Sequence, residues 1–226
     1  MAITIKSERE IELMAEAGKI LERVHNELEK ALRPGMSTKD IDTLGEEIIR
    51  SYGCIPSFLN YNGYPASICV SVNQEVVHGI PDKHRIIQEG DIVSLDAGVI
   101  YKGYHSDAAR THAVGEVSEE AKKLIQVTKE SFFEGIKFAK AGNHLFDISG
   151  AIGRYAEERG YGVVRDLCGH GIGTALHEAP EIPNYEVGRK GVRLRPGMTL
   201  AIEPMINIGT HEVDWLDDDW TVVTRD

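Results

Sequence analysis

The 226-residue sequence predicts an α+β domain built from two related halves. In each half, two segments with helical periodicity are followed by strand-like runs. Four pairs of residues are separated by the same 107 positions: Gly35 and Gly142, Gly53 and Gly160, Gly90 and Gly197, and Asp96 and Glu203. Helix stops and an acidic strand residue that repeat in phase indicate an ancestral duplication. We therefore expect one domain, 1–226, with halves of roughly 1–113 and 114–226.

The first half opens with two predicted helices. Ser7 and Glu10 form the pattern of a capping box, which begins a helix that closes near Pro34. Its apolar face is predicted to contain Ile11, Met14, Leu21, Val24, Leu28 and Leu32. The second helix follows Ser37 and stops at Gly53. Strands are then predicted at SICVSVN, at DIVSLDAGVI and along a return segment ending at Ala113.

The second half repeats this order. Helices are predicted after Ser118, to about Lys140, and after Asn143, to about Arg159. Strand patterns return at YGVVRDL, GMTLAIEPMINIG and WTVVTR. No linker-like or low-complexity segment interrupts the chain, which favours a single domain.

Composition excludes several classes of function. The formal charge of −11 argues against stable binding to nucleic acid or to an anionic membrane surface. Three widely spaced cysteines (Cys54, Cys69 and Cys168) without a CxxC pattern argue against a disulfide framework. No signal peptide and no apolar run of membrane-spanning length is recognised, so a cytoplasmic location is expected.

Four side chains in separate, glycine-punctuated apolar segments predict a metal site. They are Asp96 in GDIVSLDAG, Asp107 in YHSDAAR, His170 in CGHGIG and Glu203 in GMTLAIEPM. Carboxylates in strand-like runs are costly to bury unless a positive charge neutralises them. Three oxygen ligands with one imidazole suit Mn, Fe, Co or Zn.

The two aspartates lie on either side of a predicted hairpin turn. A turn centred between Tyr101 and Lys102 makes Asp96 and Asp107 directly opposite partners, and a turn at Lys102-Gly103 makes them diagonal neighbours. Both registers leave them within reach of one ion. Taken alone, Asp107 could be a solvated loop residue and His170 a structural hydrogen-bonding group. The coincidence of several ligand types favours the metal site.

These segments together resemble the methionine aminopeptidases, specifically the short bacterial type I enzymes. The resemblance covers the whole chain and rests on NYNGYPASICVSVN, VVHGIP, GDIVSLDAG, HSDAAR, CGHGIG, LHEAP and RPGMTLAIEPM. It implies the pita-bread (creatinase/aminopeptidase) fold, with two pseudo-symmetric halves around a central antiparallel sheet. It also implies a metalloprotease that binds up to two metal ions and removes the N-terminal methionine from nascent polypeptides. A monomer that contacts the ribosome transiently is expected.

The resemblance assigns roles residue by residue. Asp96, Asp107, His170 and Glu203 are implied to be metal ligands, with Asp107 shared between two metals. Glu203, His177 and His78 are implied to be catalytic, and both histidines also bind substrate. The implied methionine pocket consists of Phe58, Tyr61, Tyr64, Cys69, Leu176 and Trp220.

The sequence departs from the family pattern at its end. The family's fifth ligand is a glutamate on a strand that follows the segment matching WTVVTRD, and this sequence stops at Asp226. We expect a truncated form that binds its second metal weakly or not at all and has impaired activity. Two alternatives remain open: a non-catalytic or single-metal pita-bread binding module, and a pita-bread aminopeptidase of the proline type.

Overall fold

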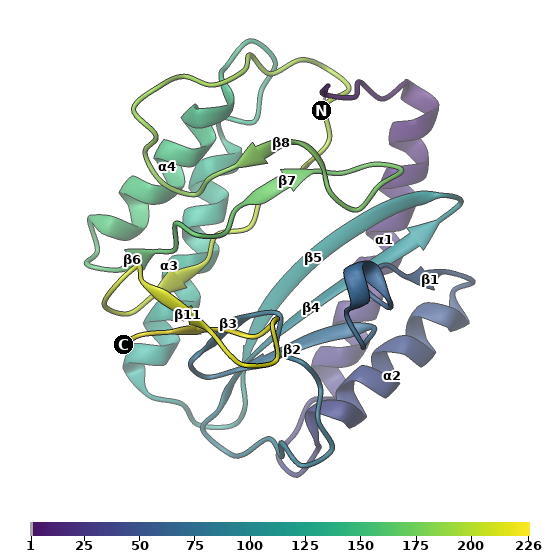
Figure 1. The fold of residues 1–226 in the computed structure, drawn as a ribbon, viewed down its shortest axis with the longest axis vertical. Coiled ribbons are helices and arrows are strands. Elements are labelled where there is room, and N and C mark those ends of the chain that lie inside the picture. The colour runs from purple at the N-terminus through teal and green to yellow at the C-terminus, as the bar shows by residue number, and fades with distance from the viewer. Residues whose placement is uncertain (1) are drawn as a thin grey trace.

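The computed structural model describes residues 2–226 and confirms the α+β fold class. Helices α1 (Glu8–Ala31) and α2 (Thr38–Ser51) lie on one side of the strands, and α3 (Glu119–Ile136) and α4 (Leu145–Glu157) lie on the other (Figure 1). Among residues 2–226, no helix is both long and apolar enough to cross a membrane.

Side-chain caps set where the helices begin. In α1 the Ser7 amide donates to the Glu10 carboxylate at 2.7 Å, and Ser7 Oγ accepts from the Glu10 amide. This confirms the predicted capping box. The fourth helix begins one position later than predicted, because His144 is its N-cap and its amide donates to Asp147. The third helix is shorter than predicted and ends at Ile136.

The central sheet is antiparallel and built on a long hairpin. Strand β4 (Ile92–Tyr101) pairs with β5 (Tyr104–Ala113), and the other edge of β4 carries β1 (Ile55–Pro56) and β2 (Ile68–Val72). The turn is Lys102-Gly103, where both residues have positive φ (49° and 84°), as the favoured two-residue hairpin turn requires.

This turn decides between the two predicted registers. Asp96 faces Ala109 and Asp107 faces Gly98. The two aspartates are therefore diagonal neighbours on one face of the hairpin, and the directly opposite pairing is wrong. Lys102 and Gly103 accept the left-handed conformation that the tight turn needs, so they occupy its two central positions.

Strands in the second half are shorter than the sequence pattern predicted. The observed elements are β6 (Gly162–Val163), β7 (Gly169–Gly171), β8 (Glu178–Ile182), β9 (Leu200–Ala201) and β10 (Ile206–Asn207). The predicted run GMTLAIEPMINIG is divided between β9 and β10, because Pro204 has no amide to donate to a strand ladder. In the first half, η1 (Tyr61–Gly63) is a short 3-10 turn.

A small sheet joins the two halves of the chain. Strand β12 (Val222–Thr224) pairs with β11 (Val213–Trp215) and with β3 (Glu75–Val77), all antiparallel. The C-terminal segment is thereby held against the first half.

Two main cores hold the helices to the strands. The larger lies between α1, α2, β2 and β4 and includes the fully buried residues Leu21, Leu28, Ile41, Ile49, Ile68 and Leu95. A second cluster in the other half contains Leu145, Ile148, Ile152, Ile182 and Leu194. The prediction that Ile11 lies on the buried apolar face is wrong, since this residue is 39% exposed.

The 107-residue spacing recurs in the backbone. The Gly35 amide donates to the Ile87 carbonyl at 2.9 Å, and the Gly142 amide donates to the Leu194 carbonyl at 3.0 Å. Both glycines have positive φ (89° and 95°). Two isolated β-bridges repeat with the same spacing: Ser37 with Ile86, and His144 with Arg193. The segments that precede α2 and α4 therefore have the same local geometry. The boundaries of the two halves stay a prediction.

Candidate metal centre

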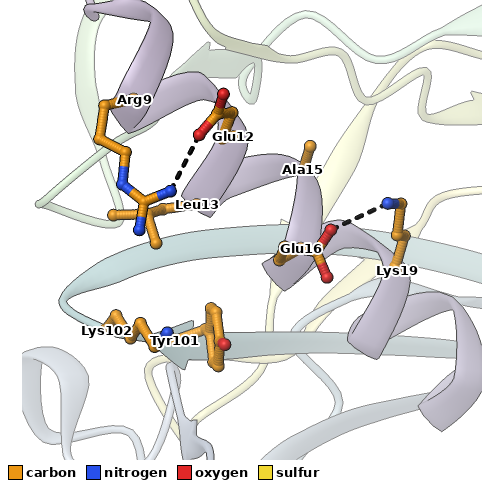
Figure 2. A pocket seen from close by; sticks show the side chains of 8 residues that line it. All are labelled: Arg9, Glu12, Leu13, Ala15, Glu16, Lys19, Tyr101 and Lys102. Atoms are coloured by element: carbon orange, nitrogen blue, oxygen red, sulfur yellow. Dashed lines mark hydrogen bonds and ion pairs between the residues drawn. The ribbon is translucent and has the colours of Figure 1, made fainter.

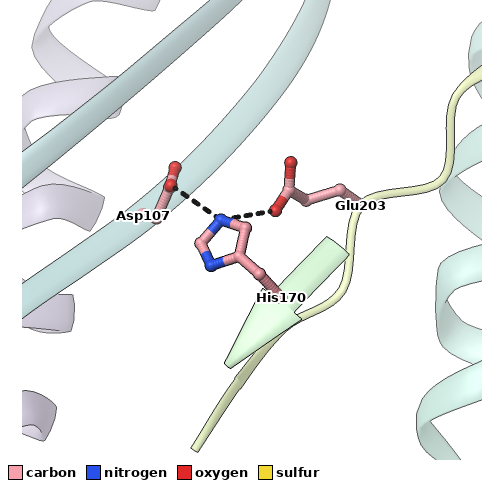
Figure 3. A group of neighbouring side chains, drawn as sticks. All are labelled: Asp107, His170 and Glu203. Carbon is pink, nitrogen blue, oxygen red and sulfur yellow. Dashed lines mark ion pairs between the residues drawn. The ribbon is translucent and has the colours of Figure 1, made fainter. Parts of the chain in front are cut away.

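Three of the predicted ligands converge between the two halves of the fold. Asp107 comes from β5, His170 from β7, and Glu203 lies two residues beyond β9 (Figure 3). One ligand atom of each lies within 4.8 Å of the other two. His170 Nε2 is 3.6 Å from Asp107 Oδ2 and 3.1 Å from Glu203 Oε1. Side chains from both halves thus share one small volume.

Glycines hold the strand that carries His170 in place. A β-carbon on Gly169 would lie 2.3 Å from the Ala201 carbonyl oxygen, and one on Gly171 would lie 2.2 Å from the Ala179 carbonyl oxygen. Only a residue without a side chain permits such approach. Strand β7 is therefore packed tightly between β8 and β9, which fixes the position of the His170 backbone.

The His170 ring is oriented by its own strand. Its Nδ1 donates to the Gly171 carbonyl at 2.8 Å, so Nε2 faces the carboxylates. Burial lowers the pKa of His170, but the hydrogen bonds and charges of Asp107 and Glu203 outweigh burial and raise that pKa to about 10. A proton on Nε2 and a divalent cation are two alternative ways to neutralise this site.

Asp96 stands beside this group, outside the set of three. Its Oδ1 is fully shielded from solvent and has no hydrogen-bond partner among residues 2–226. Burial raises the pKa of Asp96, and the charges of Asp107 and Glu203 raise it further. Asp96 thus adds a third carboxylate to the same region.

The donor set fits a divalent cation. Glu203 Oε1 is also shielded from solvent, with His170 Nε2 at 3.1 Å, and burial is the main cause of the raised pKa of Glu203. Within residues 2–226, no lysine or arginine pairs with Asp96, Asp107 or Glu203. Shielded carboxylate oxygens with one imidazole nitrogen are ligands for Mn, Fe, Co or Zn.

An apolar cluster adjoins these ligands. It contains all six residues of the predicted methionine pocket: Phe58, Tyr61, Tyr64, Cys69, Leu176 and Trp220. Cys69 borders the metal group directly, because it is paired with Asp96 between β2 and β4. We call this set the apolar pocket cluster.

The same cluster has four members that the sequence did not single out: Met14, Ala66, Ile80 and Ile172. Ile172 and Ala66 lie inside the motifs CGHGIG and NYNGYPASICVSVN, which could have identified them. Met14 comes from α1, and the apolar pattern of that helix predicted only that Met14 faces the core. Its place in the cluster depends on how α1 packs.

Two further histidines border the metal group and the apolar pocket cluster. The His177 ring centroid lies 4.0 Å from that of His170, and His177 Nδ1 is 2.7 Å from Tyr61 Oη. Partial desolvation and the His170 charge lower the pKa of His177. His78 has a φ of 59°, and its ring lies 6.3 Å from Trp220. Positive φ at a non-glycine residue is a strain that functional sites commonly carry.

A surface hollow of about 350 Å³ lies elsewhere, between α1 and the β4–β5 turn (Figure 2). It contains none of the predicted site residues. Its charged side chains pair with one another, Arg9 with Glu12 and Lys19 with Glu16. It is therefore the solvated outer face of a helix.

Comparisons with known proteins identify the family of this chain. Residues 12–224 match the family described as metallopeptidase family M24. The chain is 58% identical over 224 residues to a methionine aminopeptidase of Clostridium acetobutylicum, covering 99% of this chain and 90% of that protein.

Solved structures confirm the pita-bread fold. A methionine aminopeptidase from Thermotoga maritima superposes with a TM-score of 0.97 at 47% identity, covering 100% of this chain and 90% of that chain. An Xaa-Pro dipeptidase from Bacillus anthracis superposes with a TM-score of 0.76 at 29% identity, covering 97% of this chain and 57% of that one. By sequence, fold and site, the chain belongs to metallopeptidase family M24.

Proposed function

We propose that this chain is a metal-dependent aminopeptidase that removes N-terminal methionine from peptides and nascent polypeptides. One observation carries the proposal: the group of Asp107, His170 and Glu203 adjoins an apolar cluster that contains every residue of the predicted methionine pocket. The relatives named methionine aminopeptidase support the same activity.

The proposed ligands are Asp96, Asp107, His170 and Glu203. Asp107 Oδ2 lies 3.6 Å from His170 Nε2, and the Asp107 charge raises the pKa of Asp96. We propose that Asp107 is shared between two ions, as the family resemblance implies. We propose up to two ions of Mn, Fe, Co or Zn.

The chain's own residues supply proton transfer and orientation. A bound divalent cation acidifies water and polarises a carbonyl. Glu203, whose pKa is raised by burial, is proposed to hold the proton of the attacking water and deliver it to the leaving amine. His177 stays neutral, and if its Nδ1 accepts from the Tyr61 hydroxyl, Nε2 carries the hydrogen and can donate to the developing oxyanion.

The apolar pocket cluster suits a thioether side chain. Tyr64 and Trp220 pack edge to face with ring centroids 5.1 Å apart, and sulfur makes favourable contacts with aromatic rings. Burial raises the pKa of the Cys69 thiol, so that it stays neutral. A methionine side chain can therefore enter without meeting a charge from these residues.

Two other activities would use the same fold. A proline-type peptidase is suggested by the Bacillus anthracis relative, although this chain covers only 57% of that protein. A non-catalytic binding module would keep the fold without turnover, but it would not require the paired histidines beside the ligands.

One assay separates the three functions. The chain is incubated with Met-Ala-Ser and with Ala-Pro in Mn²⁺, Fe²⁺ or Co²⁺, and in chelator, with Asp107→Ala as the control variant. Metal-dependent release of methionine from Met-Ala-Ser is expected. Cleavage of Ala-Pro alone would assign the proline-type activity, and metal binding without cleavage of either peptide would assign the binding module.

A further inference from the structure

An ion pair shielded from solvent lies at the edge of the proposed substrate site. Lys6 Nζ donates to Glu178 Oε2, and the two side chains are only 4% and 11% exposed. Desolvating two charges offsets most of their attraction, so a buried salt bridge is weak evidence for stability. Its position suggests another role.

Glu178 holds the loop that precedes it. Its Oε1 accepts from the Ala175 amide at 3.3 Å, and the Gly173 amide donates to the Ala175 carbonyl at 3.1 Å. A β-carbon on Gly173 would lie 2.4 Å from Glu178 Oε1 and 2.5 Å from Lys6 Cε. The carboxylate and the lysine stem therefore pack directly on this loop, residues 173–177.

The loop carries two residues of the proposed substrate site. Leu176 is 2% exposed within the apolar pocket cluster, and the His177 ring lies beside that of His170. Glu178 follows His177 directly and faces Gly171 across β7 and β8. Whatever anchors the Glu178 side chain therefore also restrains its neighbours Leu176 and His177.

Lys6 is itself held in place by the backbone. Its amide donates to the Gly197 carbonyl at 2.8 Å, and a β-carbon on Gly197 would lie 2.7 Å from the Lys6 carbonyl oxygen. The N-terminal segment thus docks on the second half of the chain, near the end of the molecule where β7 and β8 lie (Figure 1).

We propose that the Lys6–Glu178 ion pair positions the loop 173–177 for substrate binding, which makes the segment before α1 a part of the substrate site. The inference rests on the proposed function. Without Lys6, the Glu178 carboxylate would be shielded and unpaired, and the lowest-energy response is for it to turn toward water. That movement displaces His177, one residue away.

Kinetics of four variants test this proposal. Lys6→Met, Glu178→Gln and the double variant are compared with Lys19→Met, which removes a solvent-exposed ion pair on α1. Methionine release from Met-Ala-Ser is measured with Mn²⁺ at saturation, and Mn²⁺ affinity is measured by calorimetry. Lys6→Met should lower kcat/KM by roughly 10- to 100-fold, the range expected for a misplaced substrate-binding group.

The controls separate positioning from general damage. Mn²⁺ affinity should stay unchanged in Lys6→Met, because neither Lys6 nor Glu178 is a proposed ligand. The double variant should recover most of the activity, since glutamine still accepts from the Ala175 amide and no shielded charge is left unpaired. Lys19→Met should match the unsubstituted protein.

Hydrogen exchange of the Ala175 amide, followed by NMR, measures how firmly the loop is held and does not depend on catalytic activity. Its exchange should accelerate about tenfold or more in Lys6→Met and stay unchanged in Lys19→Met. Any one of three outcomes would overturn the proposal. These are unchanged exchange of the Ala175 amide in Lys6→Met, unchanged kcat and KM in Lys6→Met, and a double variant less active than Lys6→Met. If Lys6→Met does not fold, a double variant less active than Glu178→Gln overturns it. An inactive unsubstituted protein refutes only the proposed function, because the exchange measurement still decides the loop.

Discussion

Without metal, the protein should lose stability as pH rises from 6.5 to 8.5. In the folded chain the pKa of His170 is raised from 6.5 to about 10. A group whose folded pKa is raised contributes stability that is fully present below its unfolded pKa and is lost as pH rises through the folded pKa. For His170 that loss begins near pH 6.5 and continues to about 10. The perturbation is a chelator that removes divalent cations.

None of the following groups opposes His170 in this window. His25, His78 and His177 have lowered pKa values, so their contributions are lost as pH falls below 6.5 and are constant above it. The raised pKa of the Cys69 thiol changes stability only above its ordinary value of 9.0. Asp96, whose folded pKa is also raised, shifts stability in the same direction as His170.

The magnitude follows from the His170 value. Two pH units at about 1.4 kcal/mol each give a ceiling of roughly 3 kcal/mol for the stability that His170 alone loses. The His170 side chain is only 8% exposed, so solvent screens this contribution little. Since about 1 kcal/mol corresponds to roughly 2–4 °C in a protein of this size, the His170 contribution should lower Tm by at most about 6–12 °C.

Thermal unfolding followed by circular dichroism at pH 6.5, 7.5 and 8.5 measures the effect. In saturating Mn²⁺ the cation replaces the proton, so the gain in Tm over the chelated protein should grow with pH. His170→Asn should flatten the pH dependence of the chelated protein. A chelated Tm that rises between pH 6.5 and 8.5, or a metal-induced gain that shrinks, would refute the reasoning.

Four further variants test separate parts of the structure. Asp107→Ala should abolish Mn²⁺ binding in calorimetry. His177→Ala should keep Mn²⁺ binding and lower turnover of Met-Ala-Ser by about 10²-fold, as loss of an oxyanion donor does. Equal loss of metal binding in both variants would contradict the assigned roles. Leu28→Ala should lower the free energy of unfolding in urea by about 3 kcal/mol, because this core side chain is 2% exposed. Gly171→Ala should weaken metal binding without altering any ligand, since its β-carbon would meet the Ala179 carbonyl at 2.2 Å. Unchanged Mn²⁺ affinity would show that β7 can shift freely.

Much of the local structure could be predicted because its causes are local. Ser7 and Ser37 accept amide hydrogens three residues ahead, so the starts of α1 and α2 depend on residues close in sequence. The ligand types were predictable for a similar reason. A carboxylate in an apolar strand requires a partner wherever the strand is placed.

The outcome of the hairpin shows the limit of this reasoning. The pattern around Asp96 and Asp107 allowed two registers, and only the turn at Lys102-Gly103 selects one. Strand lengths in the second half were overestimated for a related cause. Apolar periodicity cannot show where a strand finds a partner.

By itself, the sequence determined the starts of α1 and α2, the repeat of 107 positions and the four candidate ligands, and the family resemblance added six candidate pocket residues that lie in one cluster. Only the tertiary structure decided that Asp107, His170 and Glu203 meet, that Asp96 stands beside them, and that Lys6 reaches Glu178 across 172 positions. The physical reason is that caps and turns depend on neighbouring residues, whereas contacts between the two halves depend on how their cores pack against each other.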